Sequence, residues 1–220
     1  DLLKGAGHRV DVIDPSSGNG LVLEDAKWAD AVIVSVPISR TGSVLQKLDE
    51  ICKPETLIFD VASLKSPFID TLTDMGSRRR VCSVHPMFGP SAESMYERNV
   101  IVCDCGSPEA VDETMELLGN HGANVRQMPV ADHDRYMSYV LGLSHAVNIA
   151  FFTVLDRSGI DFQDMKTVAS TTFWKLMDTN ESVALEDPYL YYEIQHMNAN
   201  REQMLNEFDT AVHDVVEAAL

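Results

Sequence analysis

The fold is decided by the stretch Ala31-Val32-Ile33-Val34-Ser35-Val36, a helix-like segment from Thr41 to Ile51, and then Thr56-Leu57-Ile58-Phe59-Asp60. Both short runs are nearly continuous in apolar and β-branched residues, which is typical of strands buried on both faces of a parallel sheet. A strand, a helix and a second strand in this order indicate an α/β arrangement.

The same alternation extends to both sides of this stretch. A second helix-like segment runs from Pro108 to Gly119. Together these segments predict a Rossmann-like, doubly wound and mainly parallel sheet, an α/β domain of residues 1–131. The further strands that we expect are Arg9 to Asp14, Val81 to Val84, Val100 to Cys103 and Asn124 to Gln127.

From residue 132 the strand pattern stops, which predicts an all-helical second domain of residues 132–220. The helix expected from about Asp132 to Asp156 is too apolar along Tyr139 to Leu155 for a surface helix, so it must be buried by other helices or by another subunit. We expect a homodimer built on this domain; the alternative is a helical cap on a monomer. The other helices expected are Phe162 to Met177, with Asp161 as the cap, and Tyr189 to about Ala219.

Composition excludes several classes of protein. The 220 residues carry a formal net charge of −17, with 34 acidic and 17 basic side chains. This balance argues against binding to nucleic acid or to an anionic membrane. No apolar run approaches the roughly 18 residues that span a bilayer. The four cysteines form no CxxC pair, so we expect reduced thiols in a cytoplasmic protein and no metal site.

Asp14 ends the first expected strand, where an acidic residue hydrogen-bonds the ribose of a bound dinucleotide. Such a residue lies about 20 positions after a glycine-rich phosphate turn. Leu2 to Gly7 reads as the end of a helix, so we expect the first strand and the glycine turn to precede Asp1 in the natural protein. The pair Gly18 and Gly20 is no substitute, because it precedes no suitable helix. Many strands also end in Asp for reasons of turn formation alone.

The strand that ends at Ser35, Val36, Pro37 and Ile38 is the second expected part of a nucleotide site, because ligands bind at the carboxyl ends of parallel strands. We expect these residues to face the nicotinamide. The carboxylate of Asp14 favours NAD, since it would repel the 2′-phosphate of NADP. Ser16 and Ser17 leave NADP possible.

Three segments carry candidate chemistry. Asp60-Val61-Ala62-Ser63-Leu64-Lys65 and His85-Pro86-Met87-Phe88-Gly89-Pro90 each follow an expected strand and so reach the same edge of the sheet. Ser63 could instead cap a helix. A lone histidine is usually structural, but the position of His85 at a strand end makes a structural and a catalytic role equally open. The third segment is an apolar helix in which His145 and Asn148 lie on one face. They are either satisfied core residues or the polar wall of a substrate pocket.

Taken together, these segments resemble the prephenate dehydrogenase family, with arogenate dehydrogenases as close relatives. The shared motifs are Ser-Val-Pro-Ile from Ser35, Asp-x-Ala-Ser-x-Lys from Asp60, His-Pro-Met-Phe-Gly-Pro from His85, Asp132-His133-Asp134 and the Ser-His-x-x-Asn helix from Ser144. The resemblance implies an NAD(P)-binding domain, a helical dimerisation domain, and oxidative decarboxylation of prephenate to 4-hydroxyphenylpyruvate in tyrosine biosynthesis.

The resemblance also implies roles for single residues. His85 would bind the ring hydroxyl and take its proton, and Ser63 would hydrogen-bond His85 or the same hydroxyl. His145 and Asn148 would line the substrate pocket, with Lys65 adding positive charge.

One departure from the family is clear. Relatives anchor a substrate carboxylate with an arginine a few residues before an Asp-Pro pair, and here Ser182 stands at that position. Serine does not replace the bidentate guanidinium fork of arginine. Either Lys175 or Arg157 takes this role, or the substrate differs.

Three functions therefore compete. The first is an NAD(P)-dependent prephenate or arogenate dehydrogenase. The second is another two-domain hydroxyacid dehydrogenase, a class that lacks the His-Pro-Met-Phe-Gly-Pro segment. The third is a non-catalytic dimerising regulatory module, which the missing glycine turn and Ser182 favour and which Ser63, His85 and His145 oppose.

Overall fold

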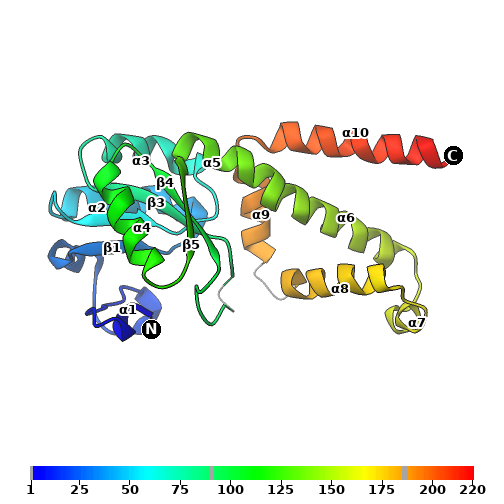
Figure 1. Cartoon of the computed structure of the whole chain (residues 1–220), viewed down its shortest axis with the longest axis horizontal. Coiled ribbons are helices and arrows are strands. Elements are labelled where there is room, and N and C mark those ends of the chain that lie inside the picture. Colours follow the sequence, from blue (N-terminus) through cyan, green and yellow to red (C-terminus); the bar gives the residue numbers. More distant parts are fainter. Residues whose placement is uncertain (1, 90–91, 185–187) are drawn as a thin grey trace. The chain divides into compact units, whose positions relative to one another are not determined.

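The chain forms two compact units, one up to His133 and one from Asp134 onward (Figure 1). The computed structural model describes residues 2–89, 92–184 and 188–220, and the side chains of these residues except 2, 180–184 and 188. The division expected after residue 131 falls inside one helix, α5 (Val130–Met137), two residues before the division between the units.

The first unit is built on a five-stranded sheet in the order β1-β2-β3-β4-β5. Neighbouring strands are parallel except for β3 and β4, which are antiparallel. The expected mainly parallel α/β sheet is therefore confirmed. The strands are β1 (Ala31–Val34), β2 (Leu57–Asp60), β3 (Val81–Pro86), β4 (Asn99–Asp104) and β5 (Asn124–Pro129).

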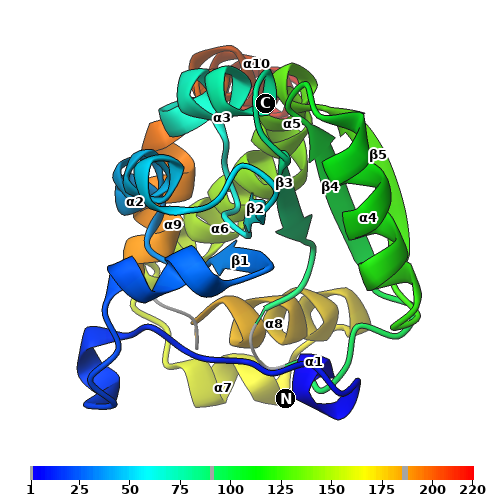
Figure 2. The same cartoon turned by 90° about the vertical axis from the view of Figure 1, so that its left-hand side faces the viewer.

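Helices cover both faces of this sheet, α2 (Ile38–Ile51) and α3 (Ile69–Gly76) on one face and α4 (Pro108–Gly119) on the other (Figure 2). Right-handed crossovers require this placement, because β4 and β5 run opposite to β1, β2 and β3. The core under α4 is apolar and closed to solvent. Its buried members are Leu57, Phe59, Cys82, Val84, Val100, Val102, Ala110, Val111 and Leu118. The unit also holds α1 (Leu2–Gly5) and the 3₁₀ helices Pro15–Ser17, Leu23–Trp28 and Ser66–Phe68.

The strand expected from Arg9 to Asp14 does not form. This segment pairs with no strand of the described sheet, and its side chains are exposed apart from half-buried Val10. An unpaired strand leaves its backbone donors and acceptors to water, so β propensity alone does not hold it extended in a ladder. The prediction of a strand here was wrong for the described chain.

The second unit is entirely helical, as expected. The helix from Val130 to Arg157 is continuous but contains a π-helical segment at Ser138–Leu143. The other two expected helices are each broken in two, at residues 168–170 and 198–200. The remaining helices are α6 (Ser144–Arg157), α7 (Phe162–Thr167), α8 (Thr171–Ala184), α9 (Pro188–Met197) and α10 (Arg201–Ala219).

The π-helical segment is the packing centre of this unit. Gly142 lies against Met204 of α10, which is 1% exposed. The carbonyl of Gly142 accepts a hydrogen bond of 2.8 Å from Gln195 Nε2 of α9. A π-bulge displaces carbonyls from the regular helical ladder, and side chains from other helices satisfy them here.

Helix α6 has a largely uncovered apolar surface. Val154 is 66% exposed and Ile149 is 50% exposed, and α10 runs away from α6 within the unit (Figure 1). By length and composition alone, the helix Val130–Arg157 could also cross a membrane, which the sequence reading did not anticipate. A helix this apolar needs a cover that the described part of the unit does not supply.

Candidate functional site

The site begins at the carboxyl edge of the sheet, where β2 and β3 run parallel and end side by side. Asp60 is the last residue of β2 and pairs in register with Ser83 of β3. His85 is the penultimate residue of β3, since pairing with Ile101 of β4 extends the strand to Pro86. The sequence reading placed His85 in a loop, and the pairing corrects this. Pro90 lies outside the described residues.

A buried ion pair fixes the turn that follows β2. The ammonium of Lys65 lies 2.8 Å from Asp60 Oδ1, and both side chains are 0% exposed. The same ammonium donates to the carbonyls of Ala62 at 2.7 Å and Val84 at 2.9 Å. The other carboxylate oxygen of Asp60 accepts from the hydroxyl of Ser83. The turn is thus bonded to the backbone of β3 directly before His85.

This geometry corrects the substrate-binding role expected for Lys65. An ammonium has three donors, and those of Lys65 go to Asp60, Ala62 and Val84 inside the protein. A fully buried, fully bonded ammonium cannot also hold a substrate carboxylate. Lys65 positions the turn instead.

Ser63 lies within this turn and is half-buried. The described residues show no hydrogen bond between Ser63 and His85, so that one of its two expected contacts is absent. Nδ1 of His85 is bonded to His133 instead. The alternative role, a hydrogen bond from Ser63 to a substrate hydroxyl, stays a prediction.

The partner of His85 is a second histidine. Nδ1 of His85 lies 3.0 Å from Nε2 of His133, which α5 carries. The rings are 5.1 Å apart and tilted by 55°. His85 is 4% exposed and His133 is 0% exposed. Burial lowers the pKa of His85 well below its ordinary value, and the nearby His133 and Lys65 lower it further, so the imidazole is neutral and can accept a proton.

His133 was missing from the site residues expected from the sequence. His133 is the central residue of the Asp132-His133-Asp134 motif, which supported the resemblance to the family but predicted no role for this residue. No periodicity shows that a residue 48 positions away meets His85. A histidine among acidic residues at the start of a helix was the one available signal.

Of the residues expected at the cofactor, Asp14, Ser35, Val36 and Pro37 are exposed, whereas Ile38 is buried at 3% exposure and packs in the core of the first unit. Ser35, Val36 and Pro37 follow the end of β1, and Ile38 begins the 14-residue helix α2. A strand end that leads into a helix N-terminus suits a nucleotide. Asp14 is exposed and accepts hydrogen bonds from the backbone N and the hydroxyl of Ser16, both at 2.8 Å. These bonds lower the pKa of Asp14 and keep it ionised.

The remaining expected residues belong to the second unit. His145 is half-buried and meets the ring of Tyr191 edge-on at 4.4 Å. Asn148 is 8% exposed and donates to the carbonyl of Ser144 at 2.8 Å. Lys175 of α8 is exposed. The backbone of Ser182 belongs to α8, and the structure does not describe its side chain.

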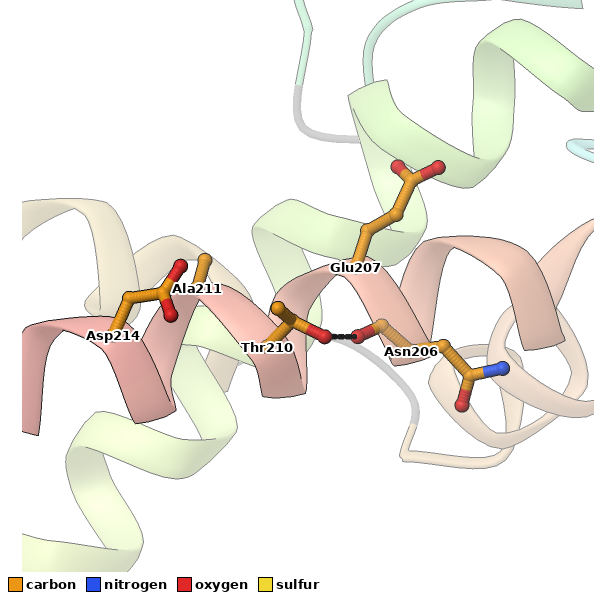
Figure 3. A pocket seen from close by; sticks show the side chains of 5 residues that line it. All are labelled: Asn206, Glu207, Thr210, Ala211 and Asp214. Atoms are coloured by element: carbon orange, nitrogen blue, oxygen red, sulfur yellow. Dashed lines mark hydrogen bonds between the residues drawn. The ribbon is translucent and has the colours of Figure 1, made fainter.

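Two surface hollows carry none of the expected residues. One follows a single helix, α10, and two of its five lining side chains are acidic (Figure 3). The other contains Arg78, Arg79 and Arg80 at the opposite edge of the sheet. Its arginines are paired with Asp49, Asp74 and Glu113, so it offers no excess positive charge. Neither hollow is therefore a better candidate for the functional site than the sheet edge at His85.

Comparison with known protein families covers both units. Residues 4–127 match the family described as prephenate dehydrogenase, nucleotide-binding domain. Residues 129–219 match the family described as prephenate dehydrogenase, dimerization domain.

The individual relatives share about a quarter of their aligned residues with this chain. A probable arogenate/prephenate dehydrogenase of Methanocaldococcus jannaschii is 28% identical over 89% of this chain and 45% of its own length. A 4-amino-4-deoxyprephenate dehydrogenase of Streptomyces pristinaespiralis is 25% identical over 77% of this chain and 57% of its own. The chain thus spans about half the length of the curated relatives it matches.

Solved structures share the fold. The prephenate dehydrogenase of Aquifex aeolicus, solved in complex with hydroxyphenyl propionate and NAD+, superimposes with a TM-score of 0.71. It is 21% identical, over 89% of this chain and 70% of that one. The arogenate dehydrogenase of Synechocystis gives a TM-score of 0.70 at 19% identity, over 90% of this chain and 74% of that one.

Proposed function

The chain belongs to the prephenate dehydrogenase family, and from this premise we propose that it carries out the NAD-dependent oxidative decarboxylation of prephenate to 4-hydroxyphenylpyruvate, a step of tyrosine biosynthesis. The observation that supports this most is the buried, neutral imidazole of His85 at the carboxyl edge of the sheet, the edge at which the parallel strands β1 and β2 also end.

The proposed chemistry uses this imidazole as a proton acceptor. The substrate ring carries a hydroxyl on one carbon and a carboxylate on the opposite carbon. The C–H bond at the hydroxyl carbon breaks as a hydride leaves, His85 Nε2 takes the hydroxyl proton, and the bond to the carboxylate breaks to release carbon dioxide. The electron pair of that bond completes the aromatic ring, and the proton returns to the ring oxygen. A bound nicotinamide supplies the hydride acceptor.

His85 has one nitrogen available for this step. Nδ1 is bonded to His133, whereas Nε2 makes no hydrogen bond with any described residue. A base with a lowered pKa remains unprotonated at neutral pH, where it can accept the hydroxyl proton. Ser63 is proposed to hydrogen-bond the same hydroxyl, and His145 and Asn148 to line the substrate pocket.

The cofactor is proposed to be NAD. The exposed residues Ser35 to Pro37 after β1, and the N-terminus of α2, which begins at buried Ile38, fit a nucleotide. The ionised carboxylate of Asp14 suits a ribose hydroxyl and would repel a 2′-phosphate. Ser16 already binds this carboxylate, so it is less available to a phosphate than the sequence suggested.

The substrate carboxylate needs a cation, and Ser182 does not supply one. We propose Lys175, which is exposed on α8, with Arg157 at the end of α6 as the alternative. Arogenate, which carries an amine in the side chain where prephenate has a ketone, is the second candidate substrate. The name of the M. jannaschii relative includes both.

We further propose that the protein is a cytoplasmic homodimer. The second unit matches a dimerization domain, and the exposed valines and isoleucine of α6 provide an apolar surface for a second copy.

The direct test is a rate measurement at 340 nm with four combinations, prephenate or arogenate with NAD or NADP. We expect the highest kcat/KM with prephenate and NAD. A preference for arogenate would reassign the substrate within the family. No NAD(P)H formation with either substrate, from a folded protein that covers the full natural chain, would reject the dehydrogenase function.

A further inference from the structure

Two buried histidines meet at the site, and only one of them is needed to take a proton from the substrate. His85 and His133 come from different elements, β3 and α5, and lie 48 residues apart in sequence. Their contact joins Nδ1 of His85 to Nε2 of His133 at 3.0 Å. Both side chains are more than nine-tenths buried, so water does not compete for this bond.

A bond between two imidazole nitrogens has a defined direction, because only one of the two nitrogens can carry the proton. If His85 donates from Nδ1, its Nε2 is unprotonated and can act as a base. If His133 donates from Nε2, the proton of neutral His85 sits on Nε2, and this ring cannot accept the substrate proton there. The partner of one ring nitrogen therefore sets the chemistry of the other.

We propose that His133 is a positioning residue that accepts a hydrogen bond from Nδ1–H of His85 and so keeps Nε2 of His85 unprotonated for the substrate hydroxyl. This inference rests on the dehydrogenase function proposed above. It assigns to a neutral imidazole the role that a carboxylate plays in a Ser-His-Asp triad, which is to hold the tautomer and the ring orientation.

The neighbouring bonds of β3 leave the imidazole of His85 to His133. The backbone of β3 is held on the other side of the strand, because Lys65 donates to the carbonyl of Val84. Ser83, two residues before His85 and on the same face of the strand, donates its hydroxyl to Asp60. None of these bonds reaches the imidazole of His85, so His133 alone among the described residues determines its tautomer by a hydrogen bond.

Neutral His133 also differs from a carboxylate in its effect on charge. When His85 takes the substrate proton, its Nδ1–H still donates to His133, whose own imidazole carries no negative charge to stabilise the new cation. The imidazolium stays acidic and returns its proton readily to the ring oxygen. His85 is kept neutral in the resting protein chiefly by burial.

The test combines a spectroscopic readout with two variants. In the full chain labelled with ¹⁵N-histidine at about pH 8, above the ordinary histidine pKa, correlation spectra distinguish protonated from unprotonated ring nitrogens. The signals of His85 are identified by their loss in His85→Asn. We expect Nδ1 protonated and Nε2 unprotonated. The opposite tautomer in the wild type would overturn the proposal without any measurement of turnover.

The variants separate the acceptor from the bulk of the ring. His133→Leu removes the acceptor, so we expect proton density on Nε2 of His85 and a kcat lower by about 10- to 100-fold, by analogy with the loss when the outer-shell partner of a metal-ligating histidine is removed. KM should change little. His133→Gln places an amide oxygen near the position of Nε2, so we expect the wild-type tautomer and a kcat within about threefold of wild type.

The matched control is His121→Leu, the same substitution at a half-buried histidine of the first unit outside the site. An equal loss of kcat in His133→Leu and His133→Gln would refute the acceptor role. So would an unchanged tautomer of His85 and an unchanged kcat in His133→Leu. If His133→Leu does not fold, the wild-type spectrum and His133→Gln still decide. Absence of dehydrogenase activity in the wild type would refute the function but would leave the tautomer measurement valid.

Discussion

At the scale of residues, the buried imidazole of His85 links the site to pH. Burial lowers its pKa in the folded protein well below the ordinary value near 6.5, whereas the unfolded chain keeps that ordinary value. Below about pH 6.5 the unfolded state therefore binds more protons than the folded state, so the free energy of unfolding falls as the pH falls. Above about pH 7 both states are neutral and this effect vanishes.

Thermal unfolding between about pH 7 and pH 5 measures this linkage. We expect the midpoint to fall with pH in the wild type and to fall less in His85→Asn, which has no proton to gain at this position. Equal pH dependence in the two proteins would show that His85 is not held neutral by the fold. The acid limb of kcat/KM should likewise lie below the ordinary histidine pKa.

The ion pair between Lys65 and Asp60 is a second feature of single residues. Both side chains are closed to solvent, and removing one partner of a buried pair leaves an uncompensated charge, at a cost of about 3–5 kcal/mol. We expect Lys65→Met to lower the free energy of unfolding in urea by about this amount. Asp60→Asn combined with Lys65→Met should recover part of the loss.

Lys47→Met is the control, since Lys47 is exposed on α2. A loss for Lys65→Met as small as that for Lys47→Met would contradict the structural role of Lys65.

The sequence placed Asp60, Ser63 and His85 at one sheet edge correctly in outline. It could not show that Lys65 turns inward or that His133 meets His85, because side-chain direction and long-range contact depend on the packed fold.

At the scale of elements, five of the six expected strands form, since each has a neighbour to pair with, including the largely polar β5. The segment from Arg9 to Asp14 has the composition of a strand but no partner in the described sheet.

In the helical unit, the sequence predicted longer helices than the structure contains. Asn198 interrupts the last expected helix by accepting from the backbone N of Asn200 at 2.8 Å and donating to the carbonyl of Asp134 at 2.8 Å. Such local competition for backbone groups breaks a helix without proline or glycine.

The end of α3 packs too closely to accept a side chain. A Cβ at Gly76 would lie 2.0 Å from the carbonyl oxygen of Cys105. We expect Gly76→Ala to force the two segments apart and to destabilise the protein by about 1–3 kcal/mol. Chemical denaturation measures this loss.

Gly119 is the matched control at the end of α4, because an added Cβ meets nothing within 4 Å there. Gly119→Ala should be neutral or stabilising by up to about 1 kcal/mol, the helix propensity difference between the two residues. Similar losses for the two variants would mean that the close approach at Gly76 is not present in solution.

At the scale of the whole molecule, the uncovered face of α6 predicts association of two copies. Val147 and Val154 are seven residues apart, so they lie on one face of the helix, and both are exposed. We expect sedimentation equilibrium of the wild type to give twice the mass of the chain. Val154→Glu places a charge in the proposed interface and should shift the protein toward the monomer.

Val22→Glu makes the same substitution at an exposed valine of the first unit and should leave the mass unchanged. A monomeric wild type would contradict the homodimer, and a Val154→Glu variant that stays fully dimeric would place the interface elsewhere.

The sequence predicted that this helix needs a cover, since its apolar composition is local information. It could not show that the described unit leaves the face open.

The central claim is that Nε2 of His85 accepts the substrate proton, and kcat of His85→Asn tests it most directly. The asparagine amide can still donate to His133 from near the position of Nδ1, but it offers no base near the position of Nε2. We predict a kcat lower by about 10²- to 10⁴-fold, the contribution of general acid–base catalysis, with KM little changed and with His121→Asn unaffected. A kcat for His85→Asn within about tenfold of wild type would show that His85 is not the base.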